Sequence, residues 1–242
     1  MKSLSREDIE NIAARVLKAY KKLPETQGGI CRIDPEMLLK KVLGLNIEYL
    51  HLSPDSSVLG ITSFEEVEVQ IYDESDTDTF FFLDGKTVLV EKELCNDSAK
   101  RGRLNFTVMH EGSHQIYKML YPRDYGVKSP PQKLHFYKGG TEYSRPITDW
   151  EEWQANALAS ALLMPRELIA RGMYIFNMGD KIKCLNRIYK HKTYEKFAYL
   201  SEFLGVSKQA LAIRMKQLGL LESDYLSNPD SMLEICGEKE YG

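Results

Sequence analysis

Apolar and polar residues follow two different periods along this chain, one helical and one of two residues. In the opening segment, apolar residues recur every third or fourth position, which predicts a helix with one buried face: Ile9, Ile12, Ala13, Val16, Leu17 and Tyr20. A second helix is predicted in "DPEMLLKKVLGL". There Asp34 suits the N-cap, Pro35 the first turn and Gly44 the end of the helix.

A period of two residues follows, which indicates strands. "VEVQIYD" alternates, and "TFFFLDGKTVLV" consists of two β-rich runs joined by Asp84 and Gly85. An Asp-Gly pair suits a type I′ turn, which needs positive φ at both central residues, so a β-hairpin is predicted here. We expect a small antiparallel sheet, followed by a helix from about Ser98 to Leu120.

The remaining pattern is helical apart from one segment. Residues 121–145 are rich in Pro, Gly, Ser and Tyr and are interpreted as a long loop, which inside a compact domain is usually functional or mobile. A helix is predicted from about Thr148 to Pro165, and the C-terminal third is expected to be helical with a frayed end. The predicted class is α+β, with a core over residues 1–175 and a helical region over 176–242.

Composition narrows the class of protein. Hydrophobic residues make up 43% and charged residues 28% of 242 positions, as in soluble globular proteins, and the net charge of -3 gives no general attraction to nucleic acid or anionic membranes. We see no signal peptide and no apolar run long enough for a membrane span. The four cysteines are scattered without a CxxC pair, so we expect a cytoplasmic protein with reduced thiols.

Candidate chemistry lies in "NFTVMHEGSHQIY", residues 105–117, which contains an HExxH motif. Positions i and i+4 of a helix are about 40° apart around the axis, so His110 and His114 project from one face and can bind one ion. Glu111 flanks that face and can act as a general base toward a water molecule on the metal. Gly112 and Ser113 are small and leave room near the ligands. The alternative is a buried helix with two hydrogen-bonded histidines.

A catalytic zinc needs a third protein ligand, and "ITDWEEWQANALASALLMP" offers one. Thr148 and Glu151 have the spacing of a capping box, which leaves Glu152 available. Residues of the same helix face are small or apolar enough to let this helix lie against the first: Asn156, Ala159 and Leu163. Alternatively, Glu152 only favours the start of its helix.

These two blocks together resemble the ImmA/IrrE family of bacterial metallo-endopeptidases. Members typically have a phenylalanine before the HExxH helix and a later Glu-x-x-Ala-Asn helix ending in Leu-Leu-Met-Pro; both occur here in order. The resemblance also covers "MLLKKVLGLNIEYL" and "LGVSKQALAIRMKQLGLL". Two departures are Gly112-Ser113 between the histidines and Gln154 where a glutamate is often found.

The resemblance implies a zincin-like, gluzincin-type site. Its ligands would be His110, His114 and Glu152, with Glu111 as general base, around Zn²⁺ or another divalent ion such as Mn²⁺ or Fe²⁺. It also implies cleavage of a partner protein, often a helix-turn-helix repressor, which relieves repression of transcription.

Further side chains are candidates for a supporting role. Asn156 could support a ligand, and the oxyanion of a reacting peptide could be stabilised by residues of the long loop: His135, Tyr137 and Tyr143. Each of these three also fits a surface or packing role. An edge of the predicted sheet could take up the substrate as an added strand.

The C-terminal region leaves a second function open. "YEKFAYLSEFLGVSKQALAIRMKQLGLL" has helix-turn-helix patterning with a turn at Gly205 and a cap at Ser207. Residues 181–218 carry nine basic and two acidic side chains, a net +7, so DNA binding through 194–218 is one interpretation. We favour packing of these helices on the rest of the protein. The alternatives to a protease of regulatory proteins are a DNA- or protein-binding regulator with a structural or sensory metal site, and a zinc aminopeptidase.

Overall fold

The structure is a computed structural model that describes residues 4–72, 79–125, 134–137 and 150–230; in residues 134–136 it describes the backbone alone. Its contacts divide the chain into two compact units, Met1–Leu163 and Met164–Gly242. The helix that follows Pro165 belongs to the second unit. Among the described helices, none is long and apolar enough to cross a membrane.

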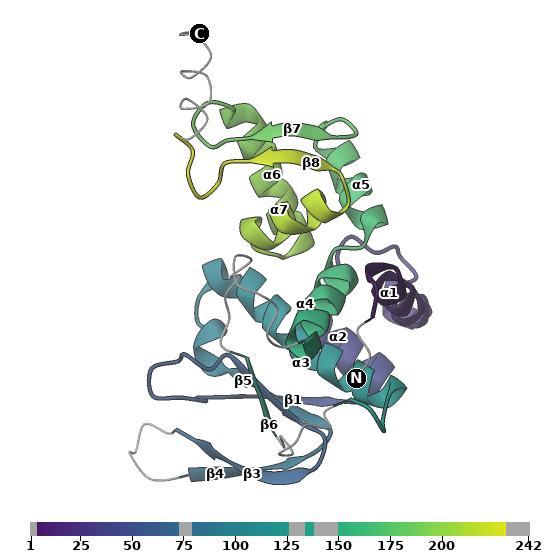
Figure 1. Cartoon of the computed structure of the whole chain (residues 1–242), viewed down its shortest axis with the longest axis vertical. Coiled ribbons are helices and arrows are strands. Elements are labelled where there is room, and N and C mark those ends of the chain that lie inside the picture. The colour runs from purple at the N-terminus through teal and green to yellow at the C-terminus, as the bar shows by residue number, and fades with distance from the viewer. Residues whose placement is uncertain (1–3, 73–78, 126–133, 138–149, 231–242) are drawn as a thin grey trace. The chain divides into compact units, whose positions relative to one another are not determined.

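The first unit contains a four-stranded sheet in the order β1-β5-β2-β6. Figure 1 labels its strands β1, β5 and β6. Its strands are β1 (Asn46–Leu50), β2 (Gly60–Ser63), β5 (Thr87–Glu91) and β6 (Leu134–Tyr137). β1 pairs with β5 in parallel, whereas β2 is antiparallel to both β5 and β6. The sheet is therefore mixed rather than antiparallel as predicted, and β6 lies in a segment that we had interpreted as loop. A parallel pair is possible because the long connection between β1 and β5 includes three other strands.

The predicted hairpin at Asp84 and Gly85 is wrong. β4 (Thr79–Asp84) pairs with β3 (Glu66–Ile71) in a separate two-stranded ribbon, and β5 joins the four-stranded sheet. Gly85 has a φ of 74°, but Asp84 is not among the residues with positive φ. The backbone thus lacks the second positive φ of a type I′ turn, and the chain bends from one sheet into the other.

The helices of the first unit follow the predicted signals closely. α1 (Arg6–Tyr20) is capped by Ser5, whose hydroxyl accepts from the Asp8 amide in a capping box. α2 (Pro35–Met37) begins after Asp34, which caps it as expected, and continues as a wider π-helical stretch, Leu38–Leu43. Gly44 ends that stretch in the left-handed region.

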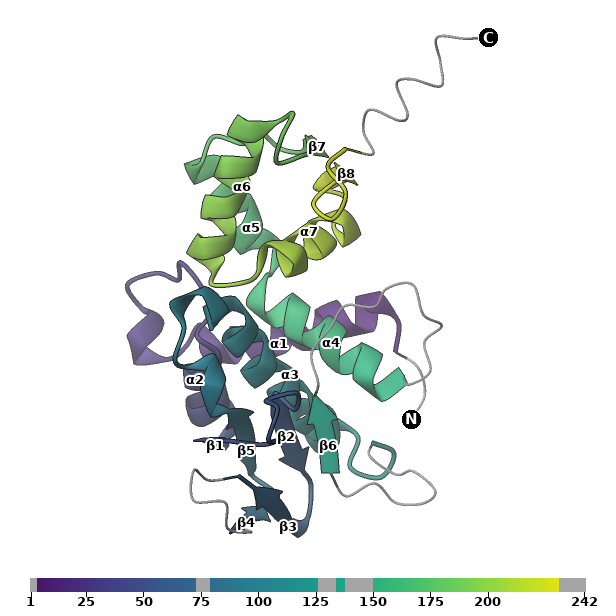
Figure 2. The same cartoon turned by 90° about the vertical axis from the view of Figure 1, so that its left-hand side faces the viewer.

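Two long helices lie at the centre of the first unit. α3 (Arg101–Leu120) packs on β2 and β5, and α4 (Trp150–Leu163) packs on α3 and on α1. Figure 2 shows α3 between the four-stranded sheet and α4. The middle of α3 is buried on all sides, over Thr107–Tyr117, so the polar side chains of this helix have partners within the unit or form a site.

The second unit is built from three helices and two short strands: α5 (Arg166–Ile175), α6 (His191–Leu204), α7 (Lys208–Gln217), β7 (Ile182–Leu185) and β8 (Leu221–Asp224). Gly205 is left-handed and Ser207 caps α7 by accepting from the Ala210 amide, as predicted. The parallel pair β7–β8 was not predicted. Arg214, the one arginine within 194–218, is buried and donates from Nε to the Met164 carbonyl, so it does not offer its charge to a phosphate.

Candidate metal centre

Two helices of the first unit bring three ligand atoms to one point. His110 and His114 lie one turn apart on α3, and Glu152 lies in the first turn of α4. Their ligand atoms all lie within 4.8 Å of one another, and the group could hold a metal ion. Both imidazoles are fully buried, whereas 32% of the Glu152 side chain is exposed, so the cluster is open to solvent on the side of the carboxylate.

The separations within the cluster match one small ion. His110 Nε2 and His114 Nε2 are 3.0 Å apart, and the two Glu152 oxygens lie 3.3 Å and 3.4 Å from them. Bonds of about 2.0–2.1 Å around a tetrahedral ion place neighbouring ligand atoms roughly 3.3 Å apart. Two imidazoles and one carboxylate suit zinc and several other divalent ions, so the arrangement does not select one metal.

The outer nitrogen of each histidine has a partner that fixes the ring. His110 Nδ1 lies 3.1 Å from Asn156 Oδ1, which can only accept, so Nδ1 donates and Nε2 keeps its lone pair for the cluster. His114 Nδ1 lies 2.7 Å from the Tyr125 hydroxyl. Such partners are the ones that orient imidazole ligands in metal sites.

Glu111 lies beside the cluster with its carboxylate enclosed. It is fully buried, and neither of its oxygens has a hydrogen-bond partner among the described residues. Burial, and second the negative charge of Glu152, raise the pKa of Glu111 well above its ordinary value. A buried carboxylate without a protein partner is costly, which points to a ligand or a water molecule as its partner.

Gly60 at the start of β2 makes room for this carboxylate. A Cβ on Gly60 would lie 2.5 Å from Glu111 Oε1 and 2.9 Å from its carboxyl carbon. The backbone of β2 therefore approaches Glu111 more closely than any other residue type would allow. Sequence reasoning missed Gly60, because nothing in "VLGITS" shows which helix the strand lies against.

Gly112 serves packing rather than access to the ligands. A Cβ there would lie 2.6 Å from Leu39 Cδ1 and 3.0 Å from its Cγ, so the small residue lets the π-helical stretch after α2 lie against α3. The room that the sequence predicted near the ligands is, at Gly112, filled by the buried Leu39 side chain. Ser113 donates to the Met109 carbonyl of its own helix.

Two further residues that sequence reasoning missed hold the site in place. Tyr125 follows α3 by five positions, where no periodicity marks it as a partner of His114. Gln115 Nε2 donates to Thr62 Oγ1 and to the Ser63 carbonyl, each at 2.8 Å, and so ties α3 to β2.

Of the three loop residues proposed to stabilise an oxyanion, the structure describes the side chain of Tyr137 alone. Tyr137, at the end of β6, lies over His110 with ring centroids 4.1 Å apart and an angle of 30° between the planes. His135 belongs to β6 and pairs with Thr62 by its backbone, but its side chain is outside the described part of the structure. Tyr143 and the capping residue Thr148 also lie outside the described residues. Asn156, as shown above, contacts His110 directly.

Comparison with known proteins gives no family assignment, since no family model and no curated protein matches the sequence.

Proposed function

We propose that this chain is a metal-dependent endopeptidase with a zincin-like core. The observation that carries the proposal is the meeting of His110, His114 and Glu152 around one point, with the enclosed carboxylate of Glu111 beside it. The described residues supply three ligands, which leaves a fourth position for a reactant as in catalytic zinc sites, whereas structural sites are closed by four. The mixed α+β architecture and the resemblance of the two sequence blocks to ImmA/IrrE peptidases support the same function.

The roles of the residues follow from their positions. A divalent ion, by proposal Zn²⁺, supplies Lewis acidity that polarises a peptide carbonyl and acidifies a water molecule. His110, His114 and Glu152 hold the ion, and Asn156 and Tyr125 keep the two imidazoles aligned. Glu111 takes the proton from the attacking water and returns it to the leaving amine as the C–N bond breaks.

The edge of the four-stranded sheet supports a protein as substrate. β6 stands at one end of the strand order, and its Tyr137 lies over His110. An extended peptide that added to this edge would pass directly beside the cluster. We propose a regulatory protein as the substrate, a helix-turn-helix repressor whose cleavage relieves repression; this part rests on the family resemblance alone.

The first experiment compares the wild-type protein with Glu111→Gln, which keeps the ligands and removes the base. With zinc added, both proteins are incubated with a mixture of unstructured peptides, and cleavage is followed by mass spectrometry. We expect Glu111→Gln to cleave about 10² to 10⁴ times more slowly, since this is the contribution of a positioned acid–base group.

Metal content provides the control for that comparison. Glu111→Gln should bind zinc in the wild-type ratio, whereas His114→Ala should lose the ion. If the zinc-loaded wild type cleaved no peptide, the peptidase function would be wrong and a regulator with a structural or sensory ion would take its place. Cleavage by Glu111→Gln at the wild-type rate would show that Glu111 is not the base.

A further inference from the structure

The ribbon of β3 and β4 has one face that the core of the first unit does not use. The inward face contributes Val67, Val69, Phe81 and Leu83 to an apolar cluster that also contains Ile61 of β2, Leu89 of β5 and Leu52, which follows β1. The outward face contains Phe80 and Phe82, which are 60% and 57% exposed. We propose that this outward face is a docking surface for a basic protein segment that carries apolar side chains.

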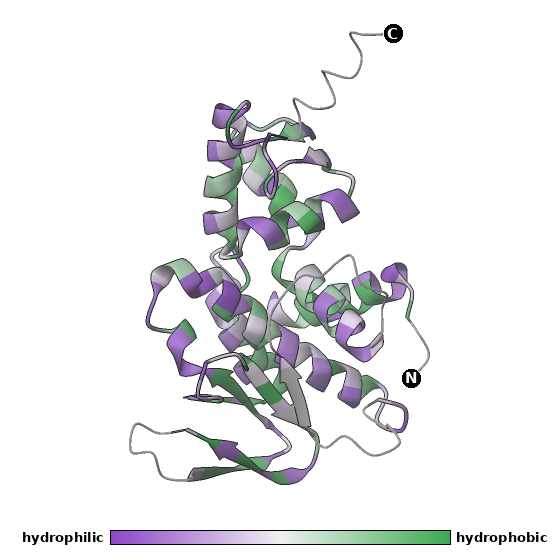
Figure 3. Ribbon diagram, turned by 60° about the vertical axis from the view of Figure 1, so that its left-hand side comes forward, coloured by the Kyte–Doolittle hydropathy of each residue, from purple (hydrophilic) through white to green (hydrophobic). Residues whose placement is uncertain are grey.

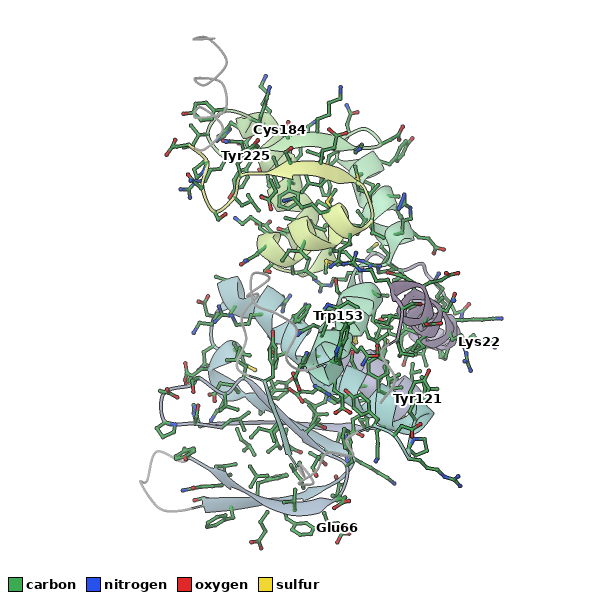
Figure 4. The ribbon with its side chains drawn as sticks, viewed as in Figure 1. Lys22, Glu66, Tyr121, Trp153, Cys184 and Tyr225 are labelled. Atoms are coloured by element: carbon green, nitrogen blue, oxygen red, sulfur yellow. The ribbon has the colours of Figure 1, made fainter. Side chains whose placement is uncertain are left out.

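The register of the ribbon places aromatic and acidic side chains next to one another. Phe82 pairs with Glu68, Phe80 with Gln70, and Glu66 with Asp84. All six positions are on the outward face because side chains alternate between faces along a strand. Glu66, Glu68 and Asp84 are exposed. In Figure 4, Glu66 points away from the strands of the four-stranded sheet.

The two exposed phenylalanines are not explained by the fold. A ribbon with one face on the core is expected to alternate apolar and polar residues, and β3 does so. In β4 the residues from Phe80 to Leu83 are all apolar, and Figure 3 shows the hydrophobic colour on both strands of the ribbon. Apolar side chains grouped on a solvent-facing surface and surrounded by polar ones are typical of a binding site for another protein.

The charge of the ribbon defines the partner. In the described residues 65–72 and 79–84, every charged side chain is acidic and exposed: Glu65, Glu66, Glu68 and Asp84. Such a surface repels nucleic acid and anionic lipid and attracts basic protein surfaces. A basic segment whose apolar side chains contact Phe80 and Phe82 would satisfy both properties of the face.

A DNA-binding repressor is a partner of this kind, because surfaces that contact phosphates are rich in lysine and arginine. This identification of the partner rests on the proposed function, whereas the docking surface itself does not. Bound in this way, a repressor would present its basic surface to the ribbon and another segment to the metal centre of the same unit.

The experiment uses a defined probe, a fluorescent twelve-residue peptide of alternating Lys and Leu, and measures its binding by anisotropy. The full-length protein carries Glu111→Gln, so that no hydrolysis interferes. We expect Phe80→Ser/Phe82→Ser and Glu66→Gln/Glu68→Gln each to weaken binding about tenfold or more. The charge control Glu7→Gln/Glu48→Gln removes two exposed acids of the same unit and should change binding less than about twofold.

Several outcomes would overturn the proposal. The first is that the Glu111→Gln protein does not bind the Lys-Leu peptide, and the second is that all variants bind it with the same affinity. The third is that a peptide in which Ser replaces Leu binds as tightly as the Lys-Leu peptide, since this would show charge attraction alone. Self-association that the Phe80→Ser/Phe82→Ser change abolishes would show that the face binds a second copy instead. Circular dichroism of the variants verifies their fold. Peptide hydrolysis plays no part in these readings, so the docking surface and the peptidase can fail independently.

Discussion

The two imidazoles of the cluster are oriented by side chains that are not themselves candidate ligands. Asn156 Oδ1 accepts from His110 Nδ1, and this contact determines which nitrogen of the ring has a free lone pair. We expect Asn156→Ala to weaken zinc binding about 10- to 100-fold, the usual effect of removing such a partner. Competition with a chromophoric chelator measures the affinity.

The conservative change separates this role from a general loss of structure. Asn156→Asp keeps an acceptor at the same position, so zinc affinity should stay near that of the wild type. Tyr125→Phe removes the hydroxyl at His114 Nδ1 and should resemble Asn156→Ala. If Asn156→Ala bound zinc as tightly as the wild type, the orientation of His110 would not depend on this contact.

Gly60 tests the position of the Glu111 carboxylate without changing any ligand. The Cβ of Gly60→Ala would lie 2.5 Å from Oε1, well inside van der Waals contact, so the carboxylate must move away. We expect peptide cleavage to fall about 10²-fold, as for other displacements of about 1 Å in active sites, while zinc binding persists. Rates and metal content are measured on the same preparation.

Gly28 provides the matched control for that change. A Cβ on Gly28 meets nothing within 4 Å, and no left-handed φ constrains this residue. Gly28→Ala should therefore cleave at the wild-type rate. Equal rates for both alanine variants would contradict the close contact between β2 and Glu111.

At the scale of elements, the sequence predicts the starts and ends of helices, which depend on neighbouring residues. Asp34 and Ser207 cap the helices they were expected to cap, and Gly44 and Gly205 end theirs in the left-handed region, because each signal acts within one turn. Strand pairing is decided by contacts between distant segments. The run "TFFFLDGKTVLV" therefore gave two correct strands and a wrong partner for each.

The same distinction applies to the centre. His110 and His114 could be paired from their spacing, and Glu152 was a candidate third ligand because it follows the expected capping residue of a second helix. Tyr125 and Gly60 could not be found in this way. Their roles depend on where a loop and a strand meet α3 in space, and no spacing in the sequence encodes those contacts.

The contact between α3 and the stretch after α2 gives a prediction about stability. Alanine in place of glycine inside a helix usually stabilises by about 1 kcal/mol, but the new Cβ at position 112 would meet three atoms of the buried Leu39 side chain. Overpacking of this kind costs about 1–3 kcal/mol, so Gly112→Ala should lower the free energy of unfolding on balance. Urea denaturation of the apo protein measures the change.

A double-mutant cycle attributes the effect to this contact. Adding Leu39→Val removes a methylene at the point of collision. The double variant should therefore lose less free energy of unfolding than the two single variants lose in total. A gain of stability in Gly112→Ala alone would show that Leu39 moves aside without cost and that the glycine is not required for packing.

At the scale of the whole molecule, all three ligands belong to the first of two units, and this makes the effect of metal local. A bound ion stabilises the state that binds it by about 2.7 kcal/mol at a hundredfold excess over Kd. Amide hydrogens of α3 and α4 exchange only when the cluster opens, so zinc should slow their exchange by up to about 100-fold. Those of α6 and α7, which have their own helical contacts, should exchange as in the apo protein.

His114→Ala tests whether this protection comes from the cluster. Hydrogen exchange of this variant followed by mass spectrometry should be the same with and without zinc in every segment, because the ligand set is incomplete. Equal slowing in α3 and in α6 of the wild type would mean that the two units open together. The ion would then stabilise both units together. The metal affinity of the proposed peptidase would in that case depend on the second unit as well.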